Sequence, residues 1–294
     1  MYILLYIYLY IIMINLVNKK DLAKRQKELI DKIIKTKQEA IDKYNVEFRK
    51  IKLYNEMNIK FDIKQNYNSI IPLNFYTCWH TKDLPPLMKA NYDQLVSQNP
   101  ELSFYLYDEN ECRNFIKNNF DLDVLNAYNS LIPCSYKSDL WRFCVLYING
   151  GIYMDIKYKC VNDFKLIALT EQEYFVRDRP INTTYTALIV VKPQNPIMLK
   201  CINQIVTNVR EQYYGLNPLY PTGPGLLGTF FSQEDFTDMK IYFTDTKTTN
   251  FSQEYMVYKN TIILTYYEEY RNEQKQYQKN KNYTQLWNER KIYN

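Results

Sequence analysis

The pattern of apolar and polar residues changes character twice along the chain. Residues 1–17 (MYILLYIYLYIIMINLV) contain no charged side chain, and residues 18 to about 67 alternate apolar and charged positions at helical spacing. Beyond that point, short apolar runs alternate with helical stretches. The two changes predict three parts: a hydrophobic segment over 1–17, a helical stem over 18–68 and a globular domain over 69–294.

The first segment has the length and composition of a membrane anchor. It reaches the lower limit for crossing a bilayer, and its tyrosines suit a membrane interface. No small-residue cleavage site follows it, so we expect an uncleaved single-pass anchor rather than a removed signal peptide. A translation start at Met13 or a buried helix is the alternative. The charges leave the orientation open, with the domain in the lumen of the secretory pathway or on the cytosolic face.

The stem prediction rests on uninterrupted helical periodicity. Apolar residues recur at helical spacing between 18 and about 67, and no glycine or proline breaks the stretch. A coiled coil is the weaker interpretation, because Lys37 and Glu47 fall where an apolar seam residue is needed.

Strand-like and helix-like patterns alternate from Pro72 onward. Strands are predicted at LNFYTCW, LSFYLYD, GIYMDI, TTYTALIVVKP, KIYFTD and TIILTYYEEY, and helices over 87–96, 109–118, 122–130, 136–148 and 197–209. This alternation predicts an α/β domain with a parallel or mostly parallel sheet. Ligands of such sheets bind beyond the carboxyl ends of the strands, where Asp108 and Asp155 stand.

Composition narrows the chemistry. The chain has 294 residues and a net charge of only +5, with no basic stripe, so no nucleic-acid partner is predicted. His80 is the only histidine, which excludes a histidine-based triad or a multi-histidine metal site. The six cysteines lack CxxC spacing and are predicted to be free thiols. A metal would therefore need oxygen ligands, which suits Mg or Mn.

The stretch SDLWRFCVLYINGGIYMDIK holds the densest set of candidate residues. Asp139 and Arg142 are three apart on a predicted helix and share a face. They form either an intrahelical ion pair or a carboxylate and guanidinium pair for a hydroxyl and a phosphate. The following Gly-Gly permits a tight turn that brings the next strand against the helix. Asp155, at the end of that strand, needs hydrogen bonds or a cation, and a divalent metal or Lys157 could supply the charge.

Residues 136–156 (YKSDLWRFCVLYINGGIYMDI) resemble the signature region of the DXD-type sugar transferases of the Och1-like family and, more distantly, the glucosylating toxins. The segments IPLNFYTCWHTKDLPP, NTTYTALIVVKPQNPIM and TGPG resemble further blocks of that family in the same order. The resemblance covers roughly Pro72 to the C-terminus. It implies a GT-A (Rossmann-like) fold and transfer of a sugar, with retention, from a UDP- or GDP-linked donor to a glycan or protein acceptor. The alternative is a catalytically degenerate protein that binds a nucleotide sugar or glycan on the same fold.

The resemblance also implies roles for individual residues. It places Trp79 at the nucleotide base, with packing in the core as the alternative. Asp139 would bind the donor sugar or ribose, and Arg142 the donor sugar or a phosphate. Tyr153 would flank the donor. Asp155 would be the first carboxylate of the DXD pair and a ligand of Mn or Mg, and it shares the catalytic role with Arg142.

Two later segments are implied to close over the site. Gly223 and Gly225 would belong to a loop that closes on the donor. Trp287 and Asn288, in YTQLWN, resemble a C-terminal lid, although plain packing is an equal interpretation for Trp287.

Lys157 departs from the family pattern, which has an aspartate at this position. Lysine does not ligate a cation at neutral pH. Metal is then bound through Asp155 with water and an oxygen from the C-terminal tail, or Lys157 itself supports the diphosphate without metal. In a third hypothesis Lys157 points away and pairs with Asp163 or the surface. Alternation along the strand disfavours the third hypothesis, and activity with and without chelator separates the first two.

Overall fold

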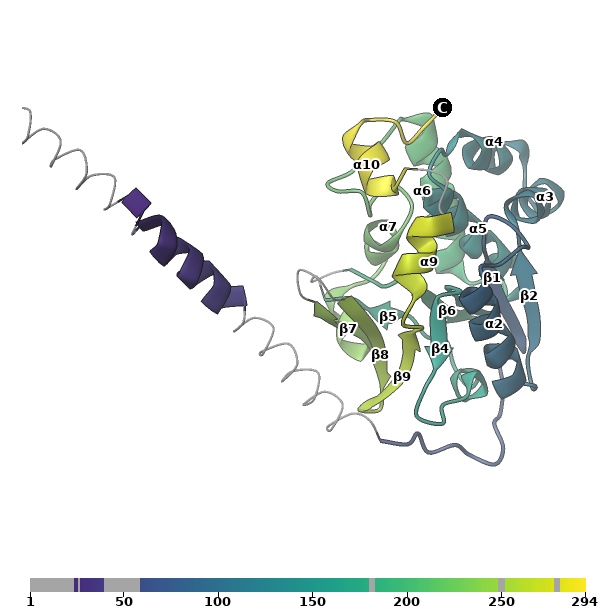
Figure 1. Ribbon diagram of the computed structural model, residues 1–294. Helices are drawn as coiled ribbons and strands as arrows, with labels where there is room; N and C mark the ends of the chain where they lie inside the picture. The colour runs from purple at the N-terminus through teal and green to yellow at the C-terminus, as the bar shows by residue number, and fades with distance from the viewer. Residues whose placement is uncertain (1–23, 26, 40–58, 180–182, 248–251, 278–280) are drawn as a thin grey trace, which may run out of the picture. The chain divides into compact units, whose positions relative to one another are not determined.

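The computed structural model describes residues 24–25, 27–39, 59–179, 183–247, 252–277 and 281–294 (Figure 1). Residues 24–25 and 27–39, within the predicted stem, are helical and have exposed side chains. The predicted anchor over 1–17 lies outside the described residues. Within the described ranges, no helix combines the length and apolarity needed to cross a membrane.

The helix prediction is wrong for residues 59–67, which are not helical. The backbone N–H of Phe61 donates to the Asn162 carbonyl oxygen at 2.7 Å instead of to a carbonyl of its own segment. The Phe61 ring is buried and meets Phe164 edge-on, with ring centroids 4.9 Å apart. A distant part of the chain therefore satisfies this backbone and buries this ring, which helical periodicity alone does not reveal.

A four-stranded sheet organises the domain, as predicted. Its strands are β1 (Asn74–Cys78), β2 (Ser103–Tyr107), β3 (Gly151–Met154) and β6 (Leu188–Val191). The order is β2-β1-β3-β6; β1 pairs in parallel with β2 and β3, and β6 is antiparallel to β3. The sheet is thus mostly parallel, and the described residues form a mixed α/β domain.

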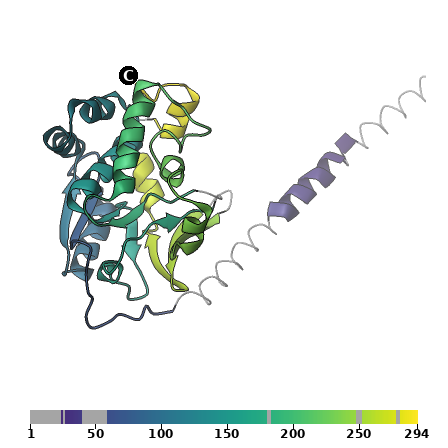
Figure 2. The ribbon, with the colours of Figure 1, turned by 180° about the vertical axis from the view of Figure 1, so that it is seen from behind.

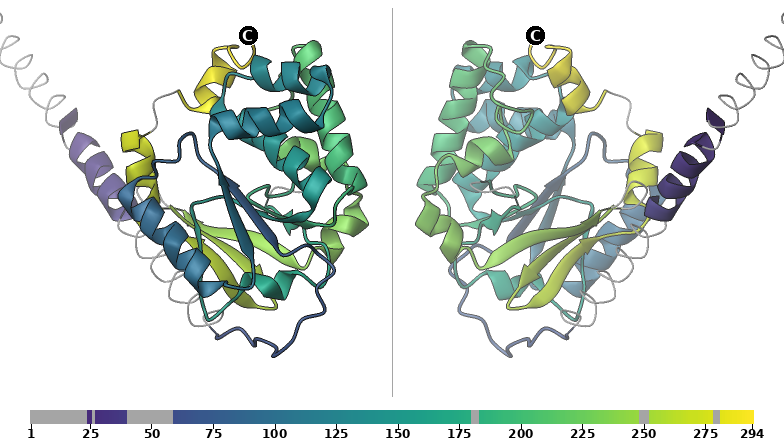
Figure 3. Two further views of the ribbon diagram at one scale, coloured as in Figure 1. Left: turned by 90° about the vertical axis from the view of Figure 1, so that its right-hand side faces the viewer. Right: turned by 90° about the vertical axis from the view of Figure 1, so that its left-hand side faces the viewer.

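Both faces of the sheet are buried at β1, β3 and β6, where neighbouring side chains enter different cores, whereas the edge strand β2 is partly exposed. Phe75 and Ile152 belong to one core, while Tyr76 and Tyr153 belong to the other. The second core contains residues of these helices: α3 (Glu109–Asn119), α4 (Leu122–Ser130), α5 (Cys134–Asn149), α6 (Pro196–Arg210), α7 (Pro224–Gly228) and α10 (Tyr283–Asn288). The first core includes residues of α2 (Pro86–Gln98) and of a second sheet, so the domain is layered (Figure 2 and Figure 3).

The second sheet was only partly predicted. It contains β4 (Tyr158–Cys160), β5 (Val176–Arg177), β7 (Ile241–Lys247), β8 (Ser252–Tyr258) and β9 (Thr261–Tyr266), in the order β4-β9-β8-β7-β5. Strands β7 and β9 match predicted apolar runs, whereas β4, β5 and β8 were missed. Figure 1 shows α9 (Tyr270–Tyr277) directly after β9, beside the ends of these strands. Two short helices, η1 (Leu166–Leu169) and α8 (Gln233–Asp238), complete the described domain.

The predicted Gly-Gly turn joins α5 to β3. Gly150 has φ 61° and Gly151 has φ 111°, both in the region that favours glycine. A Cβ atom on Gly151 would lie 2.5 Å from the Asn74 carbonyl oxygen, and one on Gly150 would lie 2.5 Å from the Pro193 nitrogen. Because of this turn, β3 runs back against α5. Arg142 of α5 and Asp155, directly after β3, therefore lie close together.

We expect Gly151→Ala to lower the free energy of unfolding by at least about 2 kcal/mol, since backbone strain and overpacking each cost about 1–3 kcal/mol. Urea denaturation measures the loss. Lys89→Ala, at an exposed position of α2, is the control and is expected to stay within about 0.5 kcal/mol of wild type. A loss below about 0.5 kcal/mol for Gly151→Ala would contradict the tight approach to Asn74.

Candidate functional site

A cavity of about 660 Å³ opens beyond the carboxyl ends of β1 and β3. This is the location predicted for a ligand of a mostly parallel sheet. Five of the ten predicted site residues line it: Trp79, Arg142, Tyr153, Asp155 and Lys157. They come from the segment after β1, from α5 and from the end of β3 with its following turn. The structure therefore brings five of the ten predicted residues to one cavity, and the other five do not line it.

Arg142 lines the cavity and contacts groups from α5, from β3 and from the segment before β6. Its Nη2 lies 3.0 Å from Asp139 Oδ1, and its Nη1 donates to the Thr186 carbonyl oxygen at 2.7 Å. Nη1 is also 3.6 Å from Asp155 Oδ1, while the Tyr153 ring lies beneath the guanidinium at 4.4 Å. Burial opposes the charge, but Tyr153 and the two aspartates raise the pKa of Arg142. The side chain is therefore a fixed cation that links helix and strand.

Asp139 lies behind Arg142 and does not line the cavity. Its Oδ1 faces Arg142, and its Oδ2 accepts a hydrogen bond from Thr222 Oγ1 at 2.8 Å. Burial raises the pKa of the Asp139 carboxyl, although Arg142 and Thr222 act in the opposite direction. The structure thus places Asp139 behind Arg142, and its predicted contact with a sugar or ribose stays a prediction.

The TGPG segment meets Asp139 rather than the cavity. A Cβ atom on Gly223 would lie 2.9 Å from Asp139 Oδ2, so the glycine leaves room for the buried carboxylate. A Cβ atom on Gly225 would lie 2.8 Å from Tyr220 Cδ2. Neither glycine lines the cavity, so their position indicates close packing and not the predicted contact with a donor.

Asp155 stands at the tip of β3 and projects into the cavity. Its Oδ1 accepts a hydrogen bond from Tyr153 Oη at 2.8 Å, and its Oδ2 lies 3.5 Å from Lys157 Nζ. The side chain is 27% exposed. The strand tip therefore carries a partly open carboxylate between two cations, Arg142 and Lys157.

Lys157 points toward Asp155, so the hypothesis that it points away is wrong. Its Nζ is 3.4 Å from Glu254 Oε2 and donates to Tyr185 Oη at 2.9 Å. Asp163, the partner proposed for an outward lysine, pairs with Lys60 at 2.8 Å. Burial works against the ammonium charge, but Glu254 and Asp155 raise the pKa of Lys157 above its ordinary value. Lys157 is thus a buried cation at the cavity wall.

Glu254 is a site residue that sequence reasoning missed. It lies on β8, a strand that was not predicted, and no motif marks it. Its Oε2 accepts hydrogen bonds from Tyr185 Oη at 2.5 Å and Tyr158 Oη at 3.1 Å, while Oε1 accepts one from Arg271 at 3.0 Å. Burial alone would raise the pKa of Glu254, but Lys157, Tyr185 and Arg271 lower it to about 2. The Glu254 carboxylate thus lies between Lys157 and Arg271 of helix α9.

The lowered pKa of Glu254 predicts a loss of stability in acid. The folded pKa of about 2 lies below the ordinary value of 4.5, so the stabilisation is present above about pH 4.5 and is lost as the pH falls toward 2. Its full size is about 3 kcal/mol, of which about 2 kcal/mol is lost by about pH 3. We expect the difference in unfolding free energy between wild type and Glu254→Gln to shrink by that amount between about pH 6 and pH 3. A difference that stays constant in urea denaturation at both pH values would contradict this linkage.

Trp79 lines the cavity at the end of β1 and also packs against the core, so the structure fits both predicted roles. Its backbone N–H donates to the Tyr107 carbonyl oxygen at 3.0 Å. Within the described part of the chain, its buried indole Nε1 has no hydrogen-bond acceptor. An unsatisfied buried donor is uncommon in folded proteins and is readily explained by a bound ligand or water.

The C-terminal tail reaches the cavity through residues other than those predicted. Trp287 Nε1 donates to the Tyr214 carbonyl oxygen at 2.6 Å, and the ring packs against the helical core. Neither Trp287 nor Asn288 lines the cavity. The tail residues that do are Tyr270, Arg271, Gln274, Lys281, Asn282 and Tyr283. The tail therefore contributes two cations to the site, and Trp287 has a packing position.

Residues 85–176 match a family model described as "Glycosyltransferase sugar-binding region containing DXD motif". The matched range contains Arg142, Tyr153, Asp155 and Lys157, which the cavity brings together. We call this matched range the glycosyltransferase region. The resemblance noted in the sequence is therefore confirmed.

The chain is also similar to curated proteins that are named as glycosyltransferases. An uncharacterized glycosyltransferase of Acanthamoeba polyphaga mimivirus is 26% identical over 120 residues, covering 40% of this chain and 47% of that protein. Inositol phosphoceramide mannosyltransferase 3 of Schizosaccharomyces pombe is 22% identical over 172 residues, covering 58% and 48%. The chain thus matches less than half the length of these relatives. Among solved structures, "PaToxG Glycosyltransferase" gives a TM-score of 0.43 at 21% identity, covering 56% of this chain and 69% of that one.

The described residues around Asp155 do not fit a divalent cation at this carboxylate. Both carboxylate oxygens already have neighbours, and the Lys157 ammonium lies 3.5 Å from Oδ2. The nearby carboxylate of Glu254 is engaged by two cations and two tyrosines. No group of three or more His, Cys, Asp or Glu side chains suited to a metal occurs in the described ranges. The predicted metal role of Asp155 therefore lacks its partner ligands.

The first hypothesis for Lys157 requires an oxygen ligand from the tail, and two side-chain amides of the described part of the tail line the cavity. Gln274 Oε1 accepts a hydrogen bond from Arg271 at 3.0 Å. Asn282 Oδ1 accepts one from the Thr284 backbone N–H at 2.8 Å. Both amide oxygens that the tail brings to the cavity are thus already used within the tail itself.

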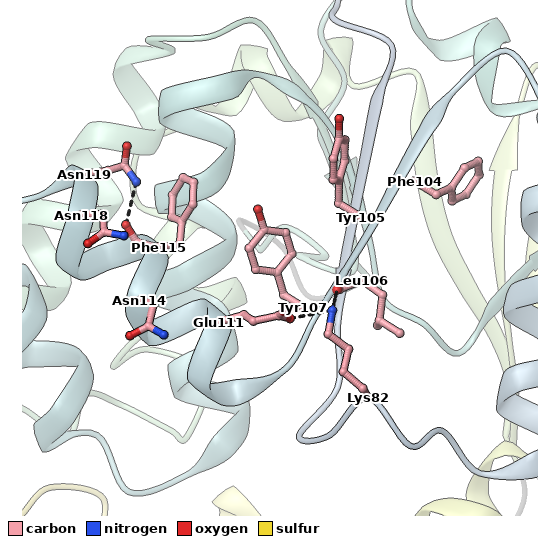
Figure 4. A pocket seen from close by; sticks show the side chains of 10 residues that line it. All are labelled: Lys82, Phe104, Tyr105, Leu106, Tyr107, Glu111, Asn114, Phe115, Asn118 and Asn119. Carbon is pink, nitrogen blue, oxygen red and sulfur yellow. Dashed lines mark hydrogen bonds and ion pairs between the residues drawn. The ribbon is translucent and has the colours of Figure 1, made fainter.

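A second cavity, of about 580 Å³, lies beside β2 and α3 (Figure 4). The Tyr107 and Phe115 side chains lie between strand and helix, and Lys82 pairs with Glu111 at 2.6 Å. None of the ten predicted site residues lines it. It therefore serves as a comparison region for experiments on the first cavity.

Proposed function

We propose that residues 69–294 form a GT-A-type glycosyltransferase domain that binds a nucleotide-diphosphate sugar in the 660 Å³ cavity and transfers the sugar, with retention, to a glycan or protein acceptor. One observation carries the proposal: Arg142 of α5 and Asp155 and Lys157 after β3, all within the matched residues 85–176, line a single cavity. The cavity volume falls within the roughly 300–1,000 Å³ of ordinary ligand sites.

The cavity offers groups for the base and for the diphosphate of such a donor. Trp79 presents an aromatic surface and an unsatisfied indole N–H for the base, and the cations suit the diphosphate. In the transfer, the bond between the anomeric carbon and the diphosphate oxygen breaks and leaves its electron pair on the diphosphate. An acceptor hydroxyl oxygen forms the new bond to the anomeric carbon and loses its proton to water.

A screen of UDP- and GDP-sugars by thermal shift tests the proposal. Because two similar proteins are named as mannosyltransferases, GDP-mannose is the first donor to include. We expect at least one donor to raise the melting temperature of wild type, and Arg271→Gln to reduce that shift. Asn118→Ala, in the second cavity, is the matched control and should leave the shift unchanged. An absence of any shift across the panel would contradict a nucleotide-sugar site.

A second candidate function is binding of a nucleotide sugar or glycan without catalysis. It is favoured by Lys157, which stands where the family pattern has a carboxylate. Release of nucleoside diphosphate decides between the two. A donor that stabilises the protein but is never cleaved would support the binding function, and turnover would exclude it.

A further inference from the structure

We propose that Lys157 and Arg271, bridged by Glu254, take the place of a divalent cation and bind the diphosphate of the donor. The inference rests on the proposed function, because it concerns the same cavity. The new element is the assignment of Glu254 and Arg271 to the diphosphate site, since no sequence pattern marks either residue.

Lys157 has both the charge and the free hydrogen-bonding capacity for a phosphate. Its ammonium group has three N–H donors, and one of them is used by Tyr185 Oη at 2.9 Å. Its carboxylate neighbours are Asp155 at 3.5 Å and Glu254 at 3.4 Å, longer than the roughly 2.7–2.9 Å of a tight charge-assisted hydrogen bond. Lys157 is therefore held in place without having its donors saturated, and it faces the cavity.

Arg271 supplies the second cation from the opposite side of Glu254. Its Nη2 donates to Glu254 Oε1 at 3.0 Å, and Nη1 donates to Gln274 at 3.0 Å. A guanidinium has five N–H donors, so several remain for a ligand. The side chain is 47% exposed and lines the same cavity as Lys157. One buried carboxylate thus positions two cations, one on the turn after β3 and one on α9.

The charge of the whole cavity agrees with an anionic ligand. Five lining residues are cations, namely Lys137, Arg142, Lys157, Arg271 and Lys281, and two are carboxylates, Glu109 and Asp155. A metal-dependent site would instead need one or two available carboxylates to hold the cation against the phosphates. Here the protein carries the positive charge itself, so the diphosphate can be neutralised by side chains.

Binding of UDP and GDP to the full chain, measured by calorimetry with EDTA and with Mn²⁺, tests the inference. We expect wild type to bind one of them with affinities that agree within about twofold in the two conditions. Lys157→Met should weaken binding at least about tenfold in both conditions, which corresponds to about 1.4 kcal/mol. Arg271→Gln, at a half-exposed position that tolerates substitution, should weaken it about three- to tenfold. Lys89→Met, an exposed lysine of α2, is the control and should bind as wild type does.

Lys157→Asp gives the sharpest outcome, because it restores the family residue. The substituted carboxylate would join Asp155 and Glu254, which together suit a divalent cation. We expect this variant to bind at least about tenfold more weakly than wild type in EDTA and to regain affinity at least about tenfold in Mn²⁺. Melting curves of all variants measure whether each of them is folded.

Several results would overturn the inference. If wild type binds nucleotide only with Mn²⁺, or if Lys157→Met and Arg271→Gln both bind normally, the two cations do not replace a metal, while the proposed function stands. If wild type binds neither UDP nor GDP in either condition, the inference and the proposed donor class both fail.

Discussion

Arg142→Met is expected to lower the free energy of unfolding by about 3–5 kcal/mol. Arg142 is 6% exposed and its guanidinium pairs with the buried Asp139. Removing the guanidinium leaves that carboxylate without its counter-ion and the Thr186 carbonyl oxygen without its donor. Breaking a buried pair by removing one partner costs much more than the net contribution of the pair, because the remaining charge is uncompensated.

Urea denaturation of Arg142→Met and of the double variant Asp139→Asn/Arg142→Met measures this effect. The double variant should regain part of the loss, since it removes the uncompensated charge. Arg210→Met, at the exposed C-terminal end of α6, is the matched control and should change stability by less than about 1 kcal/mol. A loss below about 1 kcal/mol for Arg142→Met would contradict the account that the guanidinium compensates the buried charge of Asp139.

Asp155→Asn is expected to reduce sugar transfer at least about 100-fold while leaving the fold intact. The side chain is 27% exposed to the cavity, and asparagine retains its shape and an acceptor for Tyr153. The substitution removes the charge that lies 3.6 Å from Arg142 and 3.5 Å from Lys157. Both cations then lose the carboxylate that orients them at the ligand.

The rate of nucleoside diphosphate release, with the donor found by thermal shift, measures the loss. Asp163→Asn is the control, because this exposed aspartate pairs with Lys60 outside the cavity. It should retain the wild-type rate. If Asp155→Asn retained more than about one tenth of that rate, Asp155 would not belong to the catalytic residues.

The sequence was informative where local pattern decides structure. The apolar runs of β1, β2 and β3 and the helical spacing of α5 predicted the mostly parallel sheet and its flanking helix. The Gly-Gly pair predicted the tight turn, because only glycine permits the close approach to Asn74 and Pro193. The Asp139–Arg142 spacing predicted a shared helix face, with an ion pair as one of two interpretations, and the structure shows the two side chains 3.0 Å apart.

The remainder depends on contacts between distant segments. Glu254 is brought to Lys157 by β8, a strand whose short apolar run follows a polar start and gives no clear period. Asp139 was expected at a ligand but accepts a hydrogen bond from Thr222, 83 positions away. Trp287 was interpreted either as part of a lid or as a packing residue, and its indole N–H donates to the Tyr214 carbonyl oxygen. Periodicity reports which face of an element is buried, not which partner covers it.

Release of nucleoside diphosphate from a panel of UDP- and GDP-sugars by the full chain tests most directly whether the cavity is a glycosyl-transfer site. The panel includes GDP-mannose and is run with Mn²⁺, with Mg²⁺ and with EDTA. We expect release from at least one donor, at rates that agree within about twofold in the three conditions, and almost none with Asp155→Asn. Absence of release from every donor in all three conditions, or equal release by Asp155→Asn, would contradict the proposed function.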